Sequence, residues 1–409
     1  MDPLTYLLGL EHFGIKFGLH NIRAIVERLG HPERACPCVH IAGTNGKGSV
    51  TAMVDAALRA AGHRSARYTS PHLVDLTERF VVDGRAVSSA ALSDAVATVR
   101  DAVDALRADG TLDVHPTFFE VTTAAAFELF RRERAAVAVL EVGLGGRLDA
   151  TNVAAPIVTA ITSIAFDHER YLGSTLREIA SEKAGIIKPD TPVVVSPLPP
   201  EADAVVTRIA HERRAPLVRT SPSDVAGRTI GLAGAHQCAN AAVATAVLGV
   251  LDARGIAVPE PAIVAGLAHP DWPGRLDSRT LPDGRELLMD AAHNPAGACA
   301  LASYLIDEHP HGLGPPLVFA AMRDKAIAGM LEALAPVIGE LVITRAANPR
   351  SAEPAAIAAI ARRFARDVPI TIAPILSDAL DVAWRRSRRI VVAGSIFLLG
   401  DVMERLGLH

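Results

Sequence analysis

The stretch VHIAGTNGKGS, residues 39–49, joins a short β-branched run, a glycine-rich turn and the start of a helical pattern that continues to about Ala61. Glycines let main-chain N–H groups approach phosphate oxygens, the helix that follows presents its positive end, and Lys47 neutralises terminal phosphates. The stretch departs from the strict G-x-x-x-x-G-K-[ST] pattern because Gly48 separates Lys47 from Ser49. An ordinary glycine-rich turn with an exposed lysine is the alternative, but a strand before and a helix after favour phosphate binding.

Further strands follow along the chain. The apolar runs at residues 136–142 and 157–164 lack polar alternation, which is typical of strands covered on both faces in a parallel sheet. A long alanine-rich helix is expected from Ala235 to about Leu251. The break WPGR at residues 272–275 ends this pattern, after which strand-like runs reappear at 287–289, 317–319, 341–343 and 390–392. We therefore expect an α/β fold with two domains, residues 1–275 and 276–409, the second smaller and Rossmann-like.

Composition limits the class of protein. The chain has 409 residues, of which 50% are hydrophobic and 21% charged, so a disordered or fibrous chain is excluded. The net charge of -4 gives no general affinity for nucleic acid or anionic lipid. Because no run of 18 apolar residues and no basic leader segment is present, we expect a cytoplasmic protein without a membrane partner. The four cysteines are too few and too scattered for a disulfide framework or a zinc site.

Two polar side chains follow predicted strands. Glu141 ends the first of the two apolar runs, and His168 follows the second. Ligand sites of open α/β sheets lie at such strand ends, where a carboxylate and an imidazole can hold a hydrated Mg²⁺ beside phosphates. Taken alone, each has a structural alternative, since Glu141 can pair with Arg147 and a lone histidine is more often structural.

Eight motifs occur in a fixed order along the chain. They are GTNGKGS (43–49), YTSPHL (68–73), LEVGLGGRLDATN (140–152), ITSIAFDH (161–168), EKAGIIKP (182–189), HQCANA (236–241), WPGRLD (272–277) and DAAHNP (290–295). Together they closely resemble the bifunctional dihydrofolate synthase/folylpolyglutamate synthase family of the Mur-ligase superfamily, over essentially the whole chain. The resemblance implies that residues 1–275 form an ATP-binding domain of the Mur-ligase central type, with the pterin site. Residues 276–409 would form the C-terminal glutamate-ligase domain.

The resemblance also implies a reaction. Members of the family activate a carboxylate with ATP, and the amine of L-glutamate attacks the resulting acyl phosphate. We expect addition of glutamate to 7,8-dihydropteroate and also to reduced folates, with Mg²⁺ as cofactor, a possible K⁺ requirement and a monomeric enzyme. Phosphorylation supplies the leaving group that a carboxylate lacks, so the protein must position the reactants, neutralise phosphate charge and exclude water.

Site residues carry over from the family position by position. The matched ATP-binding positions are Gly43, Thr44, Asn45, Gly46, Lys47, Gly48, Ser49, Asn240, Arg275 and Asp290. The matched metal ligands are Ser70, Glu141, His168 and Lys183, the last at a position that is carbamylated in the superfamily. Lys183, His293 and Arg275 are the expected catalytic residues, and Arg350 and Ser395 are weaker candidates for the glutamate end. The structural alternatives are a surface lysine at 183, a linker arginine at 275 and turn residues at 350 and 395.

The expected pterin-binding residues fall in two segments, Thr117, Phe118, Phe119 and Glu120, then Leu148, Asp149 and Ala150. An aromatic pair beside a carboxylate suits a flat heterocycle with N–H donors, although at least one phenylalanine is expected in the core. The triplet Thr77-Glu78-Arg79 favours enzymes that accept dihydropteroate. Departures at residues 19–21 and 324–326 affect details of the substrate site rather than the reaction.

Three rival functions stay open. A folylpolyglutamate synthase without dihydropteroate activity differs only in substrate. A muramyl-peptide ligase usually has an N-terminal domain for its UDP-substrate, for which the residues before Val39 leave no room. A P-loop ATPase switch that acts on a protein partner leaves the HQCANA, WPGR and DAAHNP motifs unexplained.

Overall fold

The computed structural model describes residues 2–14, 16–310, 312, 314–365 and 367–408. The chain divides into two compact units. Unit 1 comprises residues 1–164, 175–231 and 238–271, and unit 2 comprises residues 165–174, 232–237 and 272–409. The boundary after residue 275, between the part expected to bind ATP and pterin and the part expected to ligate glutamate, stays a prediction.

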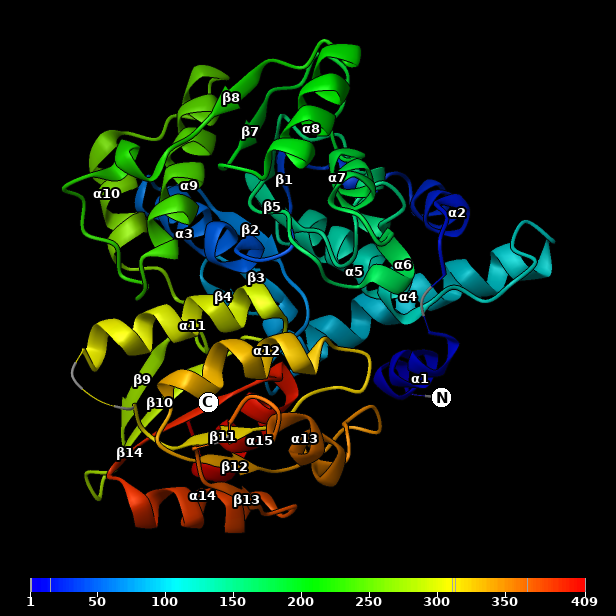
Figure 1. Ribbon diagram of the computed structural model, residues 1–409. Helices are drawn as coiled ribbons and strands as arrows, with labels where there is room; N and C mark the ends of the chain where they lie inside the picture. The colour runs from blue at the N-terminus through cyan, green and yellow to red at the C-terminus, as the bar shows by residue number, and fades with distance from the viewer. Residues whose placement is uncertain (1, 15, 311, 313, 366, 409) are drawn as a thin grey trace. The chain divides into compact units, whose positions relative to one another are not determined.

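The sheet of unit 1 has eight strands in the order β4-β3-β2-β5-β1-β6-β7-β8. Strands β1 to β5, β7 and β8 are labelled in Figure 1. Their bounds are β1 Cys38–Ala42, β2 Ser65–Tyr68, β3 Phe80–Val82, β4 Arg85–Ala86, β5 Val137–Glu141, β6 Val158–Ile161, β7 Val193–Val195 and β8 Leu217–Arg219. All pairs are parallel except β2 with β3 and β3 with β4. Strand β1 lies between β5 and β6 and is buried throughout. The predicted parallel sheet is confirmed, with an antiparallel edge.

Helices cover this sheet and connect its strands. They are α1 Pro3–Gly9, α2 His20–Arg28, α3 Lys47–Ala60, α4 Ser89–Ala108, α5 Phe118–Arg132, α7 Leu176–Ala184, α8 Pro200–Glu212, α9 His236–Ala253 and α10 Glu260–Ala268. Short 3₁₀ turns span Leu10–Phe13, Pro32–Arg34, Leu76–Arg79, Ala150–Val153 and Pro222–Val225. The chain leaves β1 towards β2 and leaves β5 towards β6, in opposite directions across the sheet. The loops after β1 and β5 therefore flank a topological switch point, where sheets of this kind bind ligands.

Unit 2 has a six-stranded sheet in the order β13-β12-β11-β14-β10-β9. Its strands are β9 Asp277–Thr280, β10 Glu286–Asp290, β11 Leu317–Phe319, β12 Leu341–Ile343, β13 Ile370–Ile372 and β14 Arg389–Ala393, and only β9 with β10 is antiparallel. Its helices are α6 Glu169–Leu172, α11 Pro295–Glu308, α12 Ile327–Leu334, α13 Pro354–Ala361, α14 Leu376–Arg386 and α15 Ile396–Leu406, with a 3₁₀ turn at Ala335–Val337. Because α14 connects β13 to β14 against the direction of the earlier crossovers, right-handed connection places it on the face opposite α11, α12 and α13.

Several strands and helices lie where the sequence predicts them. The helix after the glycine-rich turn, expected to end at about Ala61, is α3, which ends at Ala60. The runs at 136–142, 157–164, 287–289 and 390–392 correspond to β5, β6, β10 and β14, and the predicted helix 235–251 corresponds to α9. Among the described residues, no helix combines the length and hydropathy that crossing a membrane requires.

Candidate functional site

The glycine-rich turn after β1 is held by the end of β6. Thr44 N donates to the Ser163 carbonyl over 2.8 Å, and Asn45 N donates to Ser163 Oγ over 2.9 Å. Thr162 Oγ1 and Ser163 Oγ in turn donate to the Asn45 carbonyl over 2.6 and 2.9 Å. A Cβ atom at Gly43 would collide with the Thr162 hydroxyl, so only glycine allows this close approach. The loop is therefore preformed, as a phosphate-binding loop must be.

Gly46 ends the turn in the left-handed region, with φ +87°, and is the N-cap of α3. A Cβ atom there would meet the side-chain oxygen of Asn240, on α9. The HQCANA motif thus packs its asparagine directly against the predicted phosphate loop. The structure brings these two ATP-binding candidates together within unit 1.

Two lysines converge on the first residue of the turn. Lys47 Nζ donates to the carbonyls of Gly43 and Thr44 over 3.1 and 3.3 Å. Lys183 Nζ, from α7, donates to the Gly43 carbonyl over 2.8 Å, and Lys183 is 4% exposed. Lys183 is therefore not the surface lysine that was its structural alternative. A buried ammonium that contacts the phosphate loop is an unusual and costly arrangement, which points to a functional role.

Ser70 and Glu141 lie side by side next to the loop. Ser70 follows β2 and donates its main-chain N–H to Glu141 Oε2 over 3.2 Å. Glu141, at the end of β5, also has its Oε1 atom 4.0 Å from Lys47 Nζ. The alternative partner of Glu141 is excluded, because Arg147 bonds Glu182 instead, over 3.0 and 2.8 Å.

These residues fit a hard divalent cation. A carboxylate and a serine hydroxyl are oxygen ligands of the kind that Mg²⁺ prefers, and a buried lysine would add an anionic oxygen if it were carbamylated. Among the described residues, no group of three His, Cys, Asp or Glu side chains converges as a metal cluster. That finding does not bear on the predicted site, because two of the three ligands there, Ser70 and Lys183, are of other residue types.

The first pterin segment begins α5. Thr117 is the N-cap, and Glu120 completes a capping box by accepting from Thr117 N and Oγ1 over 2.8 and 2.9 Å. The buried Asn21 side chain approaches Glu120 Oε2 at 3.5 Å. The two phenylalanines are half-buried: Phe119 faces Gly143, and Phe118 lies 5.2 Å from the guanidinium carbon of Arg79. Neither ring is fully enclosed in the core, although both pack against it.

The second pterin segment is organised by Asp149. Its Oδ2 atom accepts from Leu144 N over 2.8 Å, and its Oδ1 atom accepts from Thr151 N and Oγ1 over 3.0 and 2.5 Å. Burial raises the pKa of this carboxyl, and the hydrogen bonds oppose that shift. Leu148 is half-buried, and Ala150 is buried at the start of the short helix that Asp149 caps.

The Thr-Glu-Arg triplet shapes the loop after β2. Glu78 accepts from the N–H groups of Leu73, Val74 and Asp75 over 2.7, 2.8 and 2.6 Å. Arg79 Nε donates to His72 Nδ1 over 2.9 Å. The glutamate and the arginine of the triplet therefore both hold the loop that begins with Ser70.

In unit 2, Asp290 ends β10 and is buried. Its Oδ2 atom accepts from Leu276 N and its Oδ1 atom from Ala292 N, each over 2.9 Å. Burial raises its pKa, which the charge of Arg275 opposes. Arg275 donates to the Gly274 carbonyl over 2.9 Å, and its guanidinium carbon lies 5.9 Å from the Trp272 ring centroid.

His168 and His293 meet around Asp167, a carboxylate that was not among the predicted site residues. Asp167 Oδ1 accepts from Lys325 Nζ over 2.6 Å, and Oδ2 accepts from Asn294 Nδ2 over 3.0 Å. His293 Nε2 lies 3.4 Å from Asp167 Oδ2, and its Nδ1 donates to the Ala291 carbonyl over 2.8 Å. His168 Nε2 lies 3.1 Å from Lys325 Nζ. Burial raises the pKa of Asp167, but the hydrogen bond from His293 and the charge of Lys325 bring it below its usual range.

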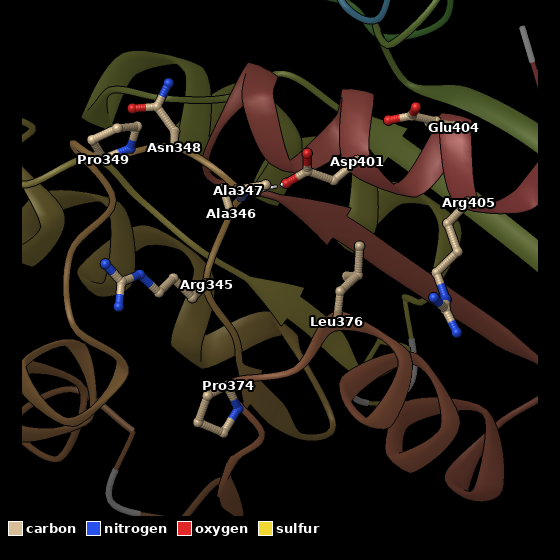
Figure 2. A pocket seen from close by; sticks show the side chains of 10 residues that line it. All are labelled: Arg345, Ala346, Ala347, Asn348, Pro349, Pro374, Leu376, Asp401, Glu404 and Arg405. Atoms are coloured by element: carbon tan, nitrogen blue, oxygen red, sulfur yellow. Dashed lines mark hydrogen bonds between the residues drawn. The ribbon is translucent and has the colours of Figure 1, made fainter.

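The two weaker candidates have local structural roles. Arg350 pairs with Asp324 over 2.9 and 2.8 Å at the surface, and Ser395 caps α15 by accepting from Phe397 N over 3.2 Å. A pocket of about 730 Å³ lies beside the loops that follow β12 and β13 (Figure 2). Its lining includes none of the predicted site residues and consists of Arg345, Ala346, Ala347, Asn348, Pro349, Pro374, Leu376, Asp401, Glu404 and Arg405.

The predicted residues thus form two groups. Unit 1 holds the phosphate loop, Ser70, Glu141, Lys183, Asn240 and both pterin segments, and unit 2 holds His168, Arg275, Asp290 and His293. Asp167 and Lys325 also lie in unit 2 and belong to the second group. In the sequence, only their position beside predicted site residues or motifs could have indicated them. Asp167 precedes His168, and Lys325 lies in the segment 324–326, where the sequence departs from the family pattern.

Comparison with known proteins identifies the family of the chain. The family model for the Mur ligase middle domain matches residues 41–226, and that for the Mur ligase glutamate ligase domain matches residues 274–396. The chain is therefore a Mur-type ligase, an ATP-dependent enzyme with a middle domain and a glutamate ligase domain.

Full-length relatives narrow the class. The chain is 32% identical to the dihydrofolate synthase/folylpolyglutamate synthase of Bacillus subtilis, over 99% of this chain and 98% of that protein. It is 34% identical to a Haloferax volcanii protein named "Probable bifunctional folylpolyglutamate synthase/dihydropteroate synthase". That match covers 98% of this chain but only 50% of the longer relative. The chain belongs to the dihydrofolate synthase/folylpolyglutamate synthase family.

Solved structures share the whole fold. Escherichia coli FolC in complex with DHPP and ADP superposes with a TM-score of 0.86 at 30% identity, covering 100% of this chain and 98% of that one. A bifunctional folylpolyglutamate synthase/dihydrofolate synthase with Mn, AMPPNP and L-glutamate bound superposes with a TM-score of 0.85 at 30% identity, over 100% and 98% of the two chains. That relative therefore combines a divalent metal ion with an ATP analogue.

Proposed function

We propose that this ligase adds L-glutamate to 7,8-dihydropteroate, and also to reduced folates, with consumption of ATP. The observation that carries the proposal is the convergence of Lys47 and Lys183 on the Gly43 carbonyl, with Glu141 and Ser70 directly beside them. Such a group of side chains serves transfer of a phosphoryl group from ATP to a carboxylate.

Positioning and charge neutralisation are the main tasks of the first unit. The N–H groups of the loop and the N-terminus of α3 would bind the phosphates of ATP, and Lys47 would neutralise their charge. Asn240 would hold the loop in place through its packing on Gly46. The carboxylate of the pterin substrate attacks the terminal phosphate to form an acyl phosphate and ADP. The amine of L-glutamate then displaces phosphate and forms the amide.

Ser70, Glu141 and a carbamylated Lys183 would hold Mg²⁺ in unit 1, and His168, in unit 2, stays a predicted ligand. Mg²⁺ would neutralise charge on the transferring phosphoryl group. The divalent ion of the relative supports a metal in this reaction, while Mg²⁺ itself and a K⁺ requirement are proposals.

The second unit would supply groups that act on ATP and on the incoming glutamate. Asp290, held by two main-chain N–H groups, offers fixed acceptor atoms for ATP. Arg275 would stabilise the transferred phosphoryl group, and His293 would act near the phosphates or the glutamate amine. We propose residues 1–275 as the ATP- and pterin-binding part and 276–409 as the glutamate-ligase part.

The pterin ring would lie against the half-buried Phe118 and Phe119. Asp149 would accept hydrogen bonds from the amino and ring N–H groups of the pterin. Its neighbours Leu148 and Ala150, together with Thr117 and Glu120, would complete the lining of the pterin site. A cytoplasmic location and a monomeric state stay predictions of the sequence.

Phosphate release from ATP tests the proposal, measured with L-glutamate and with dihydropteroate, tetrahydrofolate or no pterin. We expect turnover with dihydropteroate and a product heavier by one glutamate residue. Turnover with tetrahydrofolate alone would restrict the enzyme to chain extension. Phosphate release that ignores both pterins would overturn the proposal and favour an ATPase switch.

A further inference from the structure

One buried side chain of the central strand has no place in the proposed chemistry so far. His40 lies on β1, opposite Leu140 of β5 and Thr159 of β6, and is 0% exposed. Its Nε2 atom is 2.8 Å from Thr151 Oγ1, and among the described residues its Nδ1 atom has no hydrogen-bond partner. A buried polar ring costs free energy of folding that an apolar residue would not, so its presence calls for a reason.

The hydroxyl of Thr151 connects His40 to Asp149. A threonine hydroxyl has a single proton, and Thr151 Oγ1 lies 2.5 Å from Asp149 Oδ1 as well as 2.8 Å from His40 Nε2. An ionised carboxylate can only accept, so Thr151 must then donate to Asp149. His40 must therefore donate its Nε2 proton to Thr151 Oγ1, and its Nδ1 atom then carries no proton.

The unpartnered Nδ1 atom of His40 favours this direction of hydrogen bonding, from His40 through Thr151 to Asp149, over the opposite direction. If Asp149 were protonated and donated to Thr151, the hydroxyl would donate to His40 Nε2, and the ring proton would sit on Nδ1. A buried N–H without a partner is rarer in proteins than a buried acceptor without one. Burial raises the pKa of Asp149, and two main-chain N–H groups, one on each oxygen, offset part of that shift and favour the ionised form.

We propose that His40 is a positioning residue for the pterin site, acting through Thr151 to keep Asp149 ionised and fixed in orientation. The inference rests on the proposed function, in which Asp149 accepts hydrogen bonds from the pterin. The 2-amino-4-oxo pterin ring presents adjacent amino and ring N–H donors, which only an ionised, correctly oriented carboxylate can accept from together. Among the described residues, two further titratable groups interact electrostatically with this set, Lys188 with His40 and Tyr68 with Asp149.

Steady-state kinetics of matched variants test the proposal. His40→Leu and Thr151→Val remove the donor and the hydroxyl, while His40→Gln and Thr151→Ser retain a donor and a hydroxyl at the same places. We expect each of the first two to raise KM for dihydropteroate about tenfold, the scale of one lost buried hydrogen bond between His40, Thr151 and Asp149. KM for ATP and L-glutamate should change less than about twofold, and the two conservative variants should restore most of the binding.

The pH profile separates this role from simple loss of packing. As the pH is lowered, KM for dihydropteroate should begin to rise at a higher pH in His40→Leu than in the unchanged enzyme. The reason is that Asp149, without His40, would take up a proton more readily. Equal KM for dihydropteroate in His40→Leu and His40→Gln, or an equal rise of KM for ATP, would overturn the proposal. If His40→Leu does not fold, the Thr151→Val and Thr151→Ser pair decides the question.

Asp149→Asn separates this inference from the proposed function. If Asp149→Asn leaves KM for dihydropteroate unchanged, the pterin role of Asp149 is wrong, and the inference fails with it. If Asp149→Asn raises KM while His40→Leu and Thr151→Val do not, the pterin role stands and only the inference fails.

Discussion

Lys183 Nζ donates a 2.8 Å hydrogen bond to the main-chain carbonyl of Gly43, from a side chain that is almost completely buried. This bond joins the end of α7 to the first residue of the phosphate loop. The Lys183 side chain in this position can affect both the loop and the chemistry, and the two effects are separable by experiment.

Lys183→Ala should reduce amide formation by about a thousandfold or more, the scale for loss of a key electrostatic group in an active site. Affinity for ATP should fall by less than about threefold, because Lys47 and the loop N–H groups remain. Calorimetric ATP binding and single-turnover product formation measure the two effects. Lys47→Ala is the control and should lose both, whereas equal loss of both in Lys183→Ala would rule out a role in the chemistry.

Gly46→Ala should disable ATP binding without unfolding the protein. The added methyl group would collide with Asn240, and φ +87° is unfavourable for alanine. We expect at least a tenfold loss of ATP affinity by calorimetry. Gly249→Ala is the control, since no atom lies within 4 Å of a Cβ there and alanine favours the helix α9. Unchanged ATP affinity in Gly46→Ala would contradict the assignment of the loop.

Asp167→Asn should lower kcat for amide formation about 10- to 100-fold, the usual cost of removing a group that orients active-site side chains. Lys325 and His293 would lose the negative charge that they share. Rapid-quench kinetics at saturating ATP measure the effect. Asp283→Asn removes an exposed carboxylate that pairs only with Arg285 among described residues, and should leave kcat unchanged. A comparable loss in Asp283→Asn would show that the effect is not specific.

Stability should depend on His40 in acid. Burial lowers the pKa of His40 from 6.5 to about 3, so between these values the unfolded chain binds the proton and the folded chain does not. The free energy of unfolding therefore falls as the pH falls from 6.5 towards 3, by up to about 1.4 kcal/mol per pH unit from this group. Urea unfolding at several pH values should show a shallower acid loss in His40→Leu than in the unchanged protein. The exposed His269→Gln is the control, and parallel curves for His40→Leu and the unchanged protein would contradict the assignment.

The sequence predicted the elements whose pattern is local. The run before Gly43 and the helix after it were recognisable because strand, glycine-rich turn and helix are encoded by neighbouring residues. The buried state of Lys183 was not predictable from residue type, since it depends on α7 packing beside a loop 140 positions earlier in the chain.

The role of Asp167 was hidden for the same reason. Its partners Asn294 and Lys325 are distant in sequence, and a carboxylate before a histidine has no local signature. Glu78 was noticed as part of a triplet that favours dihydropteroate, but its three main-chain hydrogen bonds show a structural role in the loop after β2. Patterns in sequence indicate which residues matter more readily than what they touch.

The division into units has a practical consequence for engineering. The chain passes from one unit to the other five times, after residues 164, 174, 231, 237 and 271. A fragment cut at residue 272 would lack Asp167 and leave Lys325 without its carboxylate. The C-terminal part is therefore not an exchangeable cassette, and a chimaera with another ligase must transplant residues 165–174 and 232–237 along with it.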